Sequence, residues 1–448
     1  MHGFCFPTFV TTILPVMKKT SPTVVSALCG LLIVLSFSGC GSASKGTKSN
    51  EGTPQAAQAT PSDPVTAGKE TADIAPSGES SLAGPKVQDD EDTVRTERGS
   101  MFSLPLRLLQ ISMENTPRES FALSPFSLQA ALSMLVPGAG GSTKDAIMDV
   151  LEGRTTKPSD LTENEAITLK SANSLWIREG FPVRESFKDT LSDEFGAGVF
   201  VEDFSDGTAE KINSWCSDAT NGLIPSIAGK ITPEQMLFLI NAVYFKASWQ
   251  EPFNPHYERT FHSPEGDIDI PFMGDTRSYF HSVKDGWQLV EIPYKGSGYT
   301  FLLLLPPAGE ELGQCISSLT PELVESLVGS TERRRISLSL PKFKIESSTP
   351  LNDHVRKMGG EKAFQSNADF SGICPRGGLS VSSILQKCLV DVDERGTEAA
   401  AVTEVVISLT SALGAPPLRI VADRPFVFMV EDYGGKNILF EGVVSTFK

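Results

Sequence analysis

The spacing of apolar residues divides the chain near residue 100. Residues 41–98 contain almost no large apolar side chain, whereas apolar positions recur regularly from Met101 to Lys448. Apolar residues three and four positions apart predict amphipathic helices over 102–115, 124–135, 141–153 and 210–224. Runs of strand-forming residues predict strands over 236–249, 287–295, 299–307, 336–347, 387–394, 419–432 and 438–447. Because helices precede strands without βαβ alternation, we expect an α+β fold with large, mostly antiparallel sheets.

The N-terminal region has the pattern of a secretory signal. Met17-Lys18-Lys19 supplies a positive segment, residues 24–37 are apolar, and small residues lead to Cys40. The apolar run is too short and wrongly flanked for an ordinary transmembrane helix. The first sixteen residues do not fit the pattern, so Met17 is the expected start of translation.

Phe37-Ser38-Gly39-Cys40 resembles a bacterial lipoprotein box, in which the cysteine thiol takes a diacylglycerol and becomes the new N-terminus. Phe37 departs from the usual Leu, and the alternative is ordinary secretory cleavage that leaves a chance cysteine. Lipidation of Cys40 implies firm attachment, since two or more acyl chains anchor a protein stably. Gly41 replaces the Asp that often retains lipoproteins in the inner membrane, which favours the outer membrane or cell surface.

These features predict three segments: a lipoprotein signal peptide at 1–39, a tether at 40–98 and a globular domain at 99–448. The tether is rich in Gly, Ser, Thr, Ala and Pro and cannot bury enough surface to fold. As a flexible coil of about 58 residues, it would have a root-mean-square reach of roughly 40–45 Å.

Composition excludes several functions. A formal net charge of -16 argues against a nucleic-acid partner, because phosphate binding needs a basic surface. Five His residues and no Cys pair in metal-binding spacing argue against a metal site, and no cofactor is expected. We find no nucleophile elbow, Walker loop or dinucleotide motif, so we do not expect an enzyme. Of the cysteines after residue 40, Cys216 and Cys388 lie in apolar patterns and are interpreted as buried free thiols, and the sequence selects no disulfide pairing.

The segment from residue 396 to 408 has the alternation of a strand that enters a sheet. Side chains of a strand alternate between faces. One set contains no charge: Thr397, Ala399, Ala401, Thr403, Val405 and Ile407. The other set has both charges: Glu398, Ala400, Val402, Glu404, Val406 and Ser408. Gly396 gives backbone freedom before this segment, and no proline occurs until Pro416, so every N–H is able to join a ladder.

Several separated blocks between Met101 and Lys448 resemble the serpin family. They are LSPFSLQAALSMLVPGAGGST (123–143), EKINSWCSDATNGLI (210–224), INAVYFKASWQEPF (240–253), LPKFKIES (340–347), ADFSGI (368–373), DERGTEAAA (393–401) and ADRPFVFMV (422–430). The resemblance implies three mostly antiparallel sheets with eight or nine helices and an exposed reactive-centre loop. It also implies a suicide inhibitor, whose cleaved loop inserts into the largest sheet and traps the protease as a covalent 1:1 acyl-enzyme complex.

The resemblance also implies which residues act in the loop. The family's spacing from the hinge glycine places the reactive bond at Thr410-Ser411, with Leu409-Thr410 and Leu413-Gly414 as alternatives. The hinge would comprise Glu394, Gly396, Thr397, Glu398, Ala399, Ala400, Ala401 and Thr403. Thr before the bond suits an elastase-like serine protease, and Leu would suit a chymotrypsin- or subtilisin-like one. No Arg or Lys lies between Arg395 and Arg419, which argues against trypsin-like targets. Papain-like cysteine proteases are a second target class.

Two supporting clusters are implied by position. At the top of the large sheet, called the breach, Lys342 would pair with Glu394 beside Trp249. Midway along the sheet, the shutter would contain Ser124, Ser127, Asn241 and Gln386. The family usually has His where Gln386 stands, and glutamine keeps the hydrogen bonding without titrating near neutral pH.

The main alternative function is a non-inhibitory serpin that acts as a surface binding or chaperone module. Bulky or charged inward hinge residues would favour it, and here these residues are Thr and Ala. We expect a monomer that forms loop–sheet polymers on mild heating, because the segment TEVVISLT is an uncharged strand former apart from one Glu. Arg333-Arg334-Arg335 precedes a predicted strand, and we interpret it as a solvated strand start, with a binding patch as the alternative.

Overall fold

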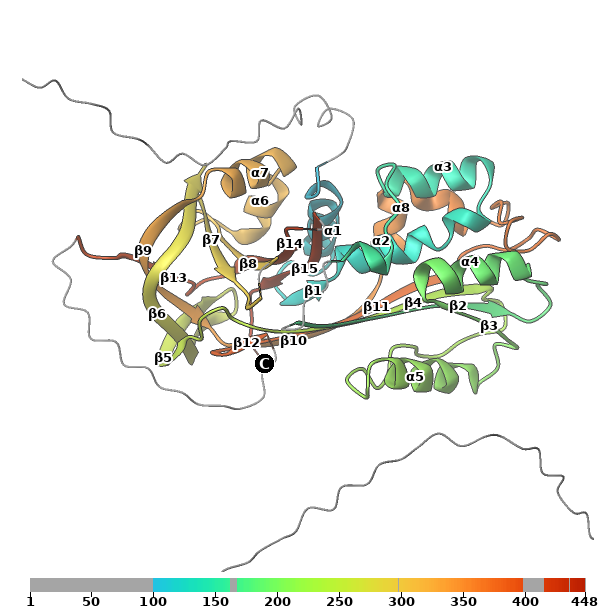
Figure 1. Ribbon diagram of the computed structural model, residues 1–448, viewed down its shortest axis with the longest axis horizontal. Coiled ribbons are helices and arrows are strands. Elements are labelled where there is room, and N and C mark those ends of the chain that lie inside the picture. Colours follow the sequence, from blue (N-terminus) through green and yellow to red (C-terminus); the bar gives the residue numbers. More distant parts are fainter. Residues whose placement is uncertain (1–99, 162–166, 297, 398–414, 435, 448) are drawn as a thin grey trace, which may run out of the picture. The chain divides into compact units, whose positions relative to one another are not determined.

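A computed structural model describes residues 100–161, 167–296, 298–397, 415–434 and 436–447 (Figure 1). Within this part, eight α-helices lie at Ser103–Asn115 (α1), Pro125–Ser133 (α2), Gly141–Val150 (α3), Glu185–Phe195 (α4), Thr208–Ala219 (α5), Leu312–Ser317 (α6), Pro321–Gly329 (α7) and Asn352–Lys357 (α8). The four predicted helices correspond to α1, α2, α3 and α5. No helix in the described ranges is long and apolar enough to cross a bilayer.

Local sequence explains several helix ends. Pro125 and Pro321 occupy first-turn positions of α2 and α7, where a missing N–H costs nothing. The hydroxyl groups of Ser124 and Thr320 accept hydrogen bonds from the free N–H groups of these first turns. α4 ends at Gly196, whose left-handed backbone (φ 58°) favours glycine.

The strands form two hydrogen-bonded sheets. The six-stranded sheet has the order β10-β11-β12-β4-β2-β3. Its strands are Phe343–Pro350 (β10), Ser383–Asp393 (β11), Gly396–Thr397 (β12), Leu237–Ser248 (β4), Ile167–Arg178 (β2) and Gly198–Glu202 (β3). Most of its neighbours run antiparallel, but β11 with β4 and β2 with β3 run parallel.

The nine-stranded sheet has the order β1-β15-β14-β8-β7-β6-β9-β13, with β5 also paired to β6. Its strands are Phe121–Leu123 (β1), Asn254–Ser263 (β5), Gly266–Lys284 (β6), Trp287–Pro293 (β7), Tyr299–Leu305 (β8), Glu332–Pro341 (β9), Leu418–Val421 (β13), Phe426–Asp432 (β14) and Asn437–Val444 (β15). The long β6 pairs with β5 over residues 266–274, with β9 over 272–281 and with β7 over 280–284. Because of these pairings through β6, two of the three expected sheets form one continuous hydrogen-bonded sheet.

Two predicted strands divide into two. Residues 336–347 contribute to β9 and β10, which belong to different sheets, and residues 419–432 contribute to β13 and β14. Lys342, between β9 and β10, donates its backbone N–H to the carbonyl of Pro271. Pro425, between β13 and β14, has no N–H for a ladder. The apolar pattern continues through both breaks, which is why the sequence indicated one strand each time.

Three apolar clusters fill the interior, and β4 takes part in all of them. Leu237 and Leu239 pack in a cluster with α1, α2 and α4, whereas Val243 and Phe245 pack in a second cluster between the two sheets. On the opposite face, Ile240 packs in a third cluster beneath α5. Figure 1 shows α5 on one side of the six-stranded sheet and α2 and α4 on the other. A near-continuous apolar strand such as β4 is therefore buried on both faces.

Candidate functional site

The hinge begins inside the six-stranded sheet. β12 lies between the ends of β11 and β4, with Thr397 opposite Val392 on one side and Ala247 on the other. A methyl group on Gly396 would stand 2.0 Å from the carbonyl oxygen of Ala247, so only glycine permits this close approach. Thr397 is buried, and its hydroxyl lies 2.7 Å from that of Tyr294. The first inward residue of the predicted alternation therefore points into the core.

Beyond β12, β11 and β4 pair directly. Their parallel register runs from Ser383 opposite Phe238 to Leu389 opposite Tyr244. We call this contact the seam. The six-stranded sheet thus contains a two-residue strand at one end of the seam and no strand between β11 and β4 along the rest of it (Figure 1).

The predicted breach residues lie together where β12 begins. The Lys342 ammonium is 3.0 Å from a carboxylate oxygen of Glu394. Trp249 is buried and donates its indole N–H to the carbonyl of Asp393 at 2.9 Å. Its ring stacks on Tyr294 with centroids 4.6 Å apart. These contacts fix the turn between β11 and β12.

Asp393 also shapes that turn. One carboxylate oxygen accepts from the backbone N–H groups of Arg395 (2.8 Å) and Gly396 (3.2 Å), and the other is 3.0 Å from the Arg395 guanidinium. An Asp that accepts from the backbone two residues later is a common way to reverse a chain. The turn sends the chain back antiparallel to β11 and to β4, between the ends of these two strands.

The shutter residue Gln386 bonds to the start of α2. Its amide oxygen accepts from the Ser124 N–H and its amide nitrogen donates to the Ser124 carbonyl, both at 2.9 Å. The Ser124 hydroxyl in turn accepts from the Ser127 N–H at 3.2 Å. Gln386 is buried, so this paired contact replaces the water it loses on folding.

Asn241 lies across the seam from Gln386 and is also buried. Its side-chain nitrogen donates to Asn173 on β2 at 2.6 Å, while its side-chain oxygen has no partner among the described residues. The Ser127 hydroxyl is likewise buried without a partner there. Asn241 therefore bonds toward β2 and Gln386 bonds toward the start of α2, so the side-chain hydrogen bonds of this polar pair point away from the seam.

The polar row separates two apolar clusters. On β4, Leu239 lies in one cluster and Val243 in the other, with Asn241 between them. On β11, Ile384 and Cys388 flank Gln386 in the same way. Two neighbouring strands thus change from apolar to polar at the same level of the sheet.

Several predicted site residues lie outside the described residues. These are Cys40, the reactive bond Thr410-Ser411, and the hinge residues Glu398, Ala399, Ala400, Ala401 and Thr403. Of the predicted hinge, Glu394, Gly396 and Thr397 lie together at the breach. The sequence interpretation did not identify Tyr294, Asp393 or Asn173 as parts of the site. Asp393 had a local signal, because it stands two residues before Arg395 and three before Gly396, whereas the other two contact their partners only through the fold.

The four cysteines of the described residues are free and buried, as predicted for Cys216 and Cys388. Burial raises the pKa of the Cys216 thiol to about 11, and it also raises the pKa of Cys388. These thiols are therefore protonated at neutral pH and do not suit nucleophilic chemistry.

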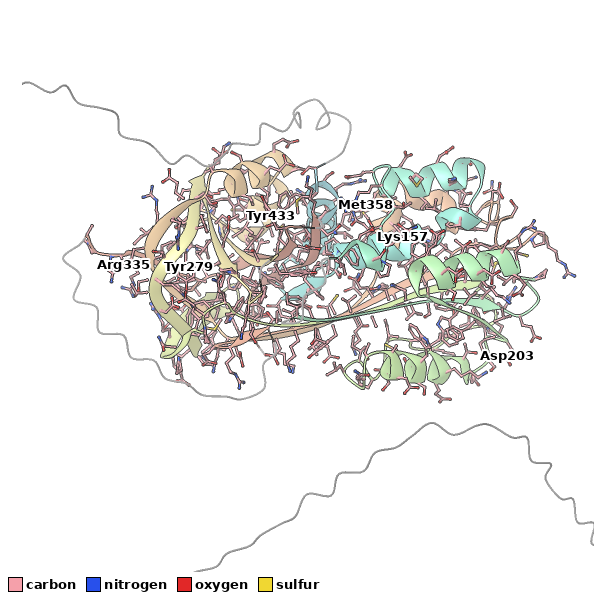
Figure 2. All side chains as sticks on the ribbon, viewed as in Figure 1. Lys157, Asp203, Tyr279, Arg335, Met358 and Tyr433 are labelled. Atoms are coloured by element: carbon pink, nitrogen blue, oxygen red, sulfur yellow. The ribbon has the colours of Figure 1, made fainter. Side chains whose placement is uncertain are left out.

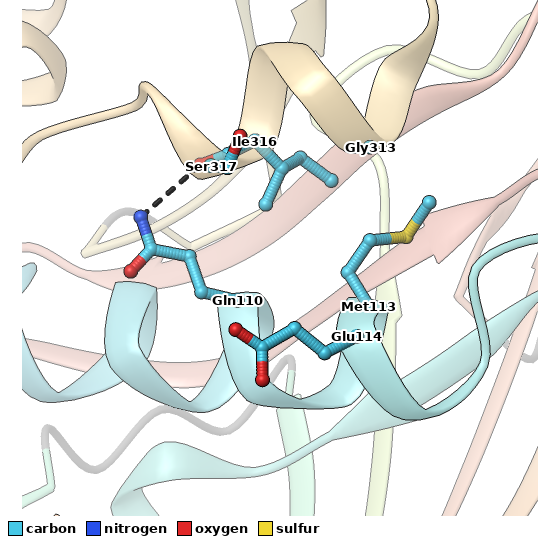
Figure 3. A pocket seen from close by; sticks show the side chains of 6 residues that line it. All are labelled: Gln110, Met113, Glu114, Gly313, Ile316 and Ser317. Carbon is cyan, nitrogen blue, oxygen red and sulfur yellow. Dashed lines mark hydrogen bonds between the residues drawn. The ribbon is translucent and has the colours of Figure 1, made fainter.

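A hollow of about 310 Å³ lies between α1 and α6 (Figure 3). The Gln110 amide at its wall donates to the carbonyls of Ile316 (3.1 Å) and Leu319 (3.0 Å). Glu114 accepts from Lys357 at 2.8 Å. Because both polar side chains are already engaged, we assign no ligand to this hollow.

Comparisons with known proteins agree with this architecture. A sequence model of the serpin (serine protease inhibitor) family matches residues 100–446. An uncharacterized serpin-like protein of Thermococcus kodakarensis is 33% identical over 71% of this chain and 79% of its own length. A serine protease inhibitor of Cyanea capillata is 31% identical, covering 72% and 91%. The crystal structure of the thermophilic serpin tengpin in its native state is similar, with a TM-score of 0.71, 28% identity and coverage of 81% and 96%.

The fold combines a large sheet, in which β11 and β4 pair directly beyond the two-residue β12, with a second, nine-stranded sheet. The chain belongs to the serpin family, and its fold is the serpin fold.

Proposed function

We propose that this chain inhibits a serine-type endopeptidase by acting as a suicide substrate. The protease serine would attack the carbonyl carbon of Thr410, forming an ester bond to Thr410 and breaking its amide bond to Ser411. The freed amine of Ser411 would leave on the C-terminal part of the chain. The hinge would then insert into the seam and carry the acylated protease with it before water hydrolyses the ester.

The observation that carries this proposal is the register of β12. Thr397 lies opposite Ala247 and Val392. Continuing antiparallel, each later residue meets a residue one position earlier on both neighbours. The inward residues would then meet matching chemistry: Ala399 would meet Phe245 and Val390, Ala401 would meet Val243 and Cys388, Thr403 would meet Asn241 and Gln386, and Val405 would meet Leu239 and Ile384, by extension of the β12 register. The hydroxyl of Thr403 thus coincides with the polar row, and the apolar residues coincide with apolar ones.

The same register supports a separation of the strands without sliding. If β12 were extended, the register along β4 and the register along β11 would both bring residue 403 between Asn241 and Gln386. These two residues already lie opposite each other in the seam. The strands therefore need only to separate. A new central strand would replace one parallel ladder with two antiparallel ladders, which favours insertion.

The sequence of the loop supports a limited set of targets. Thr410 before the bond suits a protease with a small, apolar-tolerant primary pocket, such as an elastase-like enzyme. Cleavage after Leu409 or Leu413 would indicate a chymotrypsin- or subtilisin-like target. No Lys or Arg lies between Arg395 and Arg419, which argues against a trypsin-like target. Papain-like cysteine proteases are a second class that acts through an acyl-enzyme.

We also propose that the chain is a lipoprotein of the bacterial envelope, anchored through Cys40 and displaying a monomeric inhibitor on the outer membrane or cell surface. The sequence around Cys40 and the Gly/Ser/Thr/Pro-rich segment that follows support this. Mass spectrometry of the membrane fraction would test it, with diacylated Cys40 expected at the N-terminus. A soluble chain cut elsewhere would contradict it.

The first test of inhibition is to mix the full chain in mild detergent with elastase-like, chymotrypsin-like, subtilisin-like and papain-like proteases. We expect an SDS-stable 1:1 complex and a released peptide that begins at Ser411. A peptide that begins at Thr410 or Gly414 would retain the mechanism and change the reactive bond. Cleavage in the loop without a stable complex would instead favour a non-inhibitory serpin.

A further inference from the structure

One face of the nine-stranded sheet carries several arginines. Along β9, Ile336, Leu338 and Leu340 are buried. Because side chains alternate along a strand, Arg333 and Arg335 lie on the opposite, outer face, and both are exposed. Figure 2 shows Arg335 at the outside of this edge, and Figure 1 shows β6, β9 and β13 side by side there. The predicted solvated strand start is thus the beginning of β9.

Neighbouring strands add to this outer face. Phe280 on β6 lies opposite Arg333, and the guanidinium of Arg333 is 5.8 Å from the centre of its ring. Phe280 is 44% exposed, which is high for a large apolar side chain on a strand. Arg419 on β13 is exposed and lies opposite Ser337 of β9, two positions from Arg335. We call Arg333, Arg335, Arg419 and Phe280 the arginine face.

The arginine face contrasts with the charge of the whole chain, which is -16. The nearby carboxylates have other cations: Glu332 is 3.0 Å from Arg334, and Asp423 is 3.8 Å from Arg424. Within the described residues, no carboxylate lies within ion-pair distance of Arg333, Arg335 or Arg419. These three cations are therefore solvated charges that a partner can reach.

The arginine face lies close in sequence to the reactive bond. β13 begins at Leu418, seven residues after Ser411. Seven residues span at most about 25 Å even when fully extended. A small globular domain is about 30 Å across, so a protease bound at the loop would reach β13 and its neighbours.

We propose that the arginine face is a docking surface for the target protease, and that it binds an acidic patch beside the protease active site. This docking proposal rests on the proposed function, and it adds that the inhibitor distinguishes target proteases by their surface charge. Arginine and aromatic side chains contribute most to binding in protein interfaces. Charges at an interface rim mainly raise the association rate, and this effect decreases with salt. The reactive loop would select proteases whose primary specificity pocket accepts the residue before the cleaved bond. The arginine face would then favour, among these proteases, the ones with an acidic surface near the active site.

The test uses two elastase-like serine proteases that share primary specificity but have opposite net surface charge. Each is prepared active and with its catalytic serine replaced by alanine. The full chain is compared with a triple variant, Arg333→Glu, Arg335→Glu and Arg419→Glu. The matched control variant, Arg118→Glu, Lys144→Glu and Arg376→Glu, makes the same charge change at exposed positions on other elements. The separate variant Phe280→Ala tests the apolar contact.

With the acidic protease, we expect the arginine-face variant to lose roughly tenfold in association rate and most of its salt dependence. The control variant should retain both, the basic protease should not show the loss, and the number of inhibitor molecules consumed per protease should stay constant. Binding of the serine-to-alanine proteases reports docking without loop insertion. If they bind through the arginine face but the active forms make no covalent complex, docking stands and the inhibitory function fails. Equal rates and affinities for all variants would overturn the docking surface, whatever the outcome for inhibition.

Discussion

At the scale of single residues, Glu441 is a fully buried carboxyl group within the core. It is fully buried on β15, opposite Leu123 and Met429, and these neighbours belong to an apolar cluster. Neither of its carboxylate oxygens has a partner among the described residues. Burial therefore raises its pKa well above the usual range. On the neighbouring strand β14, burial and the charges of Glu291 and Asp432 raise the pKa of Glu431 to about 7.

We predict that Glu441→Met stabilises the protein by about 1–3 kcal/mol at neutral pH, because it removes an unpaired buried polar group. An acid with a raised pKa in the folded state binds protons that the unfolded state has lost. Stability therefore falls as pH rises above about 4.5, the unfolded value, toward the folded pKa. Denaturant titrations between pH 5 and 8 should show a shallower decline for Glu441→Met. The near-isosteric Glu441→Gln separates charge from shape, and an unchanged pH profile in both variants would contradict the assignment.

Gln386, at the predicted shutter, has no group that titrates in the neutral range. We predict that Gln386→His introduces a loss of stability as pH falls, because a protonated imidazole cannot accept the Ser124 N–H. The wild-type inhibition rate, divided by the protease's own rate on a peptide substrate at each pH, should stay nearly constant from pH 6 to 8. Gln386→Met is the comparison: it should be independent of pH and less stable by about 1–3 kcal/mol, since it leaves the Ser124 N–H unpaired, whereas the Ser124 carbonyl keeps the Leu128 N–H. A His variant with a flat profile would show that this contact does not control the seam.

At the scale of elements, the hinge allows a matched pair of substitutions. On insertion, residue 399 would lie between Phe245 and Val390 in the core, whereas residue 398 would lie between Lys246 and Asp391 on the outer side. We predict that Ala399→Arg converts the inhibitor into a substrate, because insertion would bury an unpaired charge. Glu398→Arg should retain inhibition. The measurement is the ratio of covalent complex to cleaved chain on denaturing gels, and similar ratios for both variants would contradict the inserted register.

Each predicted helix and strand range corresponds to an element of the structure, but β1, β2, β3, β5 and β6 were not predicted, nor was the way in which the strands join. The alternation at 397–407 indicated an inserting strand, since each face has its own chemistry along the chain. The divisions of 336–347 and 419–432 were not predicted, because the apolar period does not say which sheet a strand joins. The contacts of Tyr294 with Thr397 and of Asn173 with Asn241 join residues that are distant in sequence. α4, α6, α7 and α8 were not identified. Three of these are short: α6 and α8 have six residues each and α7 has nine, which gives few turns over which a helical period can repeat.

At the scale of the whole molecule, a strand with the same alternation from a second molecule could pair with β11 and β4 in the register expected for the chain's own hinge. We predict that mild heating produces loop–sheet polymers, in which the hinge of one molecule enters the seam of the next. Size-exclusion chromatography after incubation below the unfolding temperature should show a series of peaks from dimers and larger oligomers. Ala399→Arg should suppress these oligomers, whereas Glu398→Arg should not. A chain that stays monomeric until it unfolds would contradict this prediction.

The direct pairing of β11 and β4, in the same sheet and beyond the end of β12, has a consequence for the lifetime of the proposed inhibitor. With the loop outside the sheet, the chain would occupy a state above its lowest free energy, and the seam would be the barrier that keeps it there. The working life of each molecule would then be set by how often the seam opens by chance. Substitutions that strengthen the contact between β11 and β4 would lengthen the lifetime of the active form. They would also slow loop insertion after cleavage, so a longer lifetime and a faster inhibition would place opposite demands on the same few residue pairs.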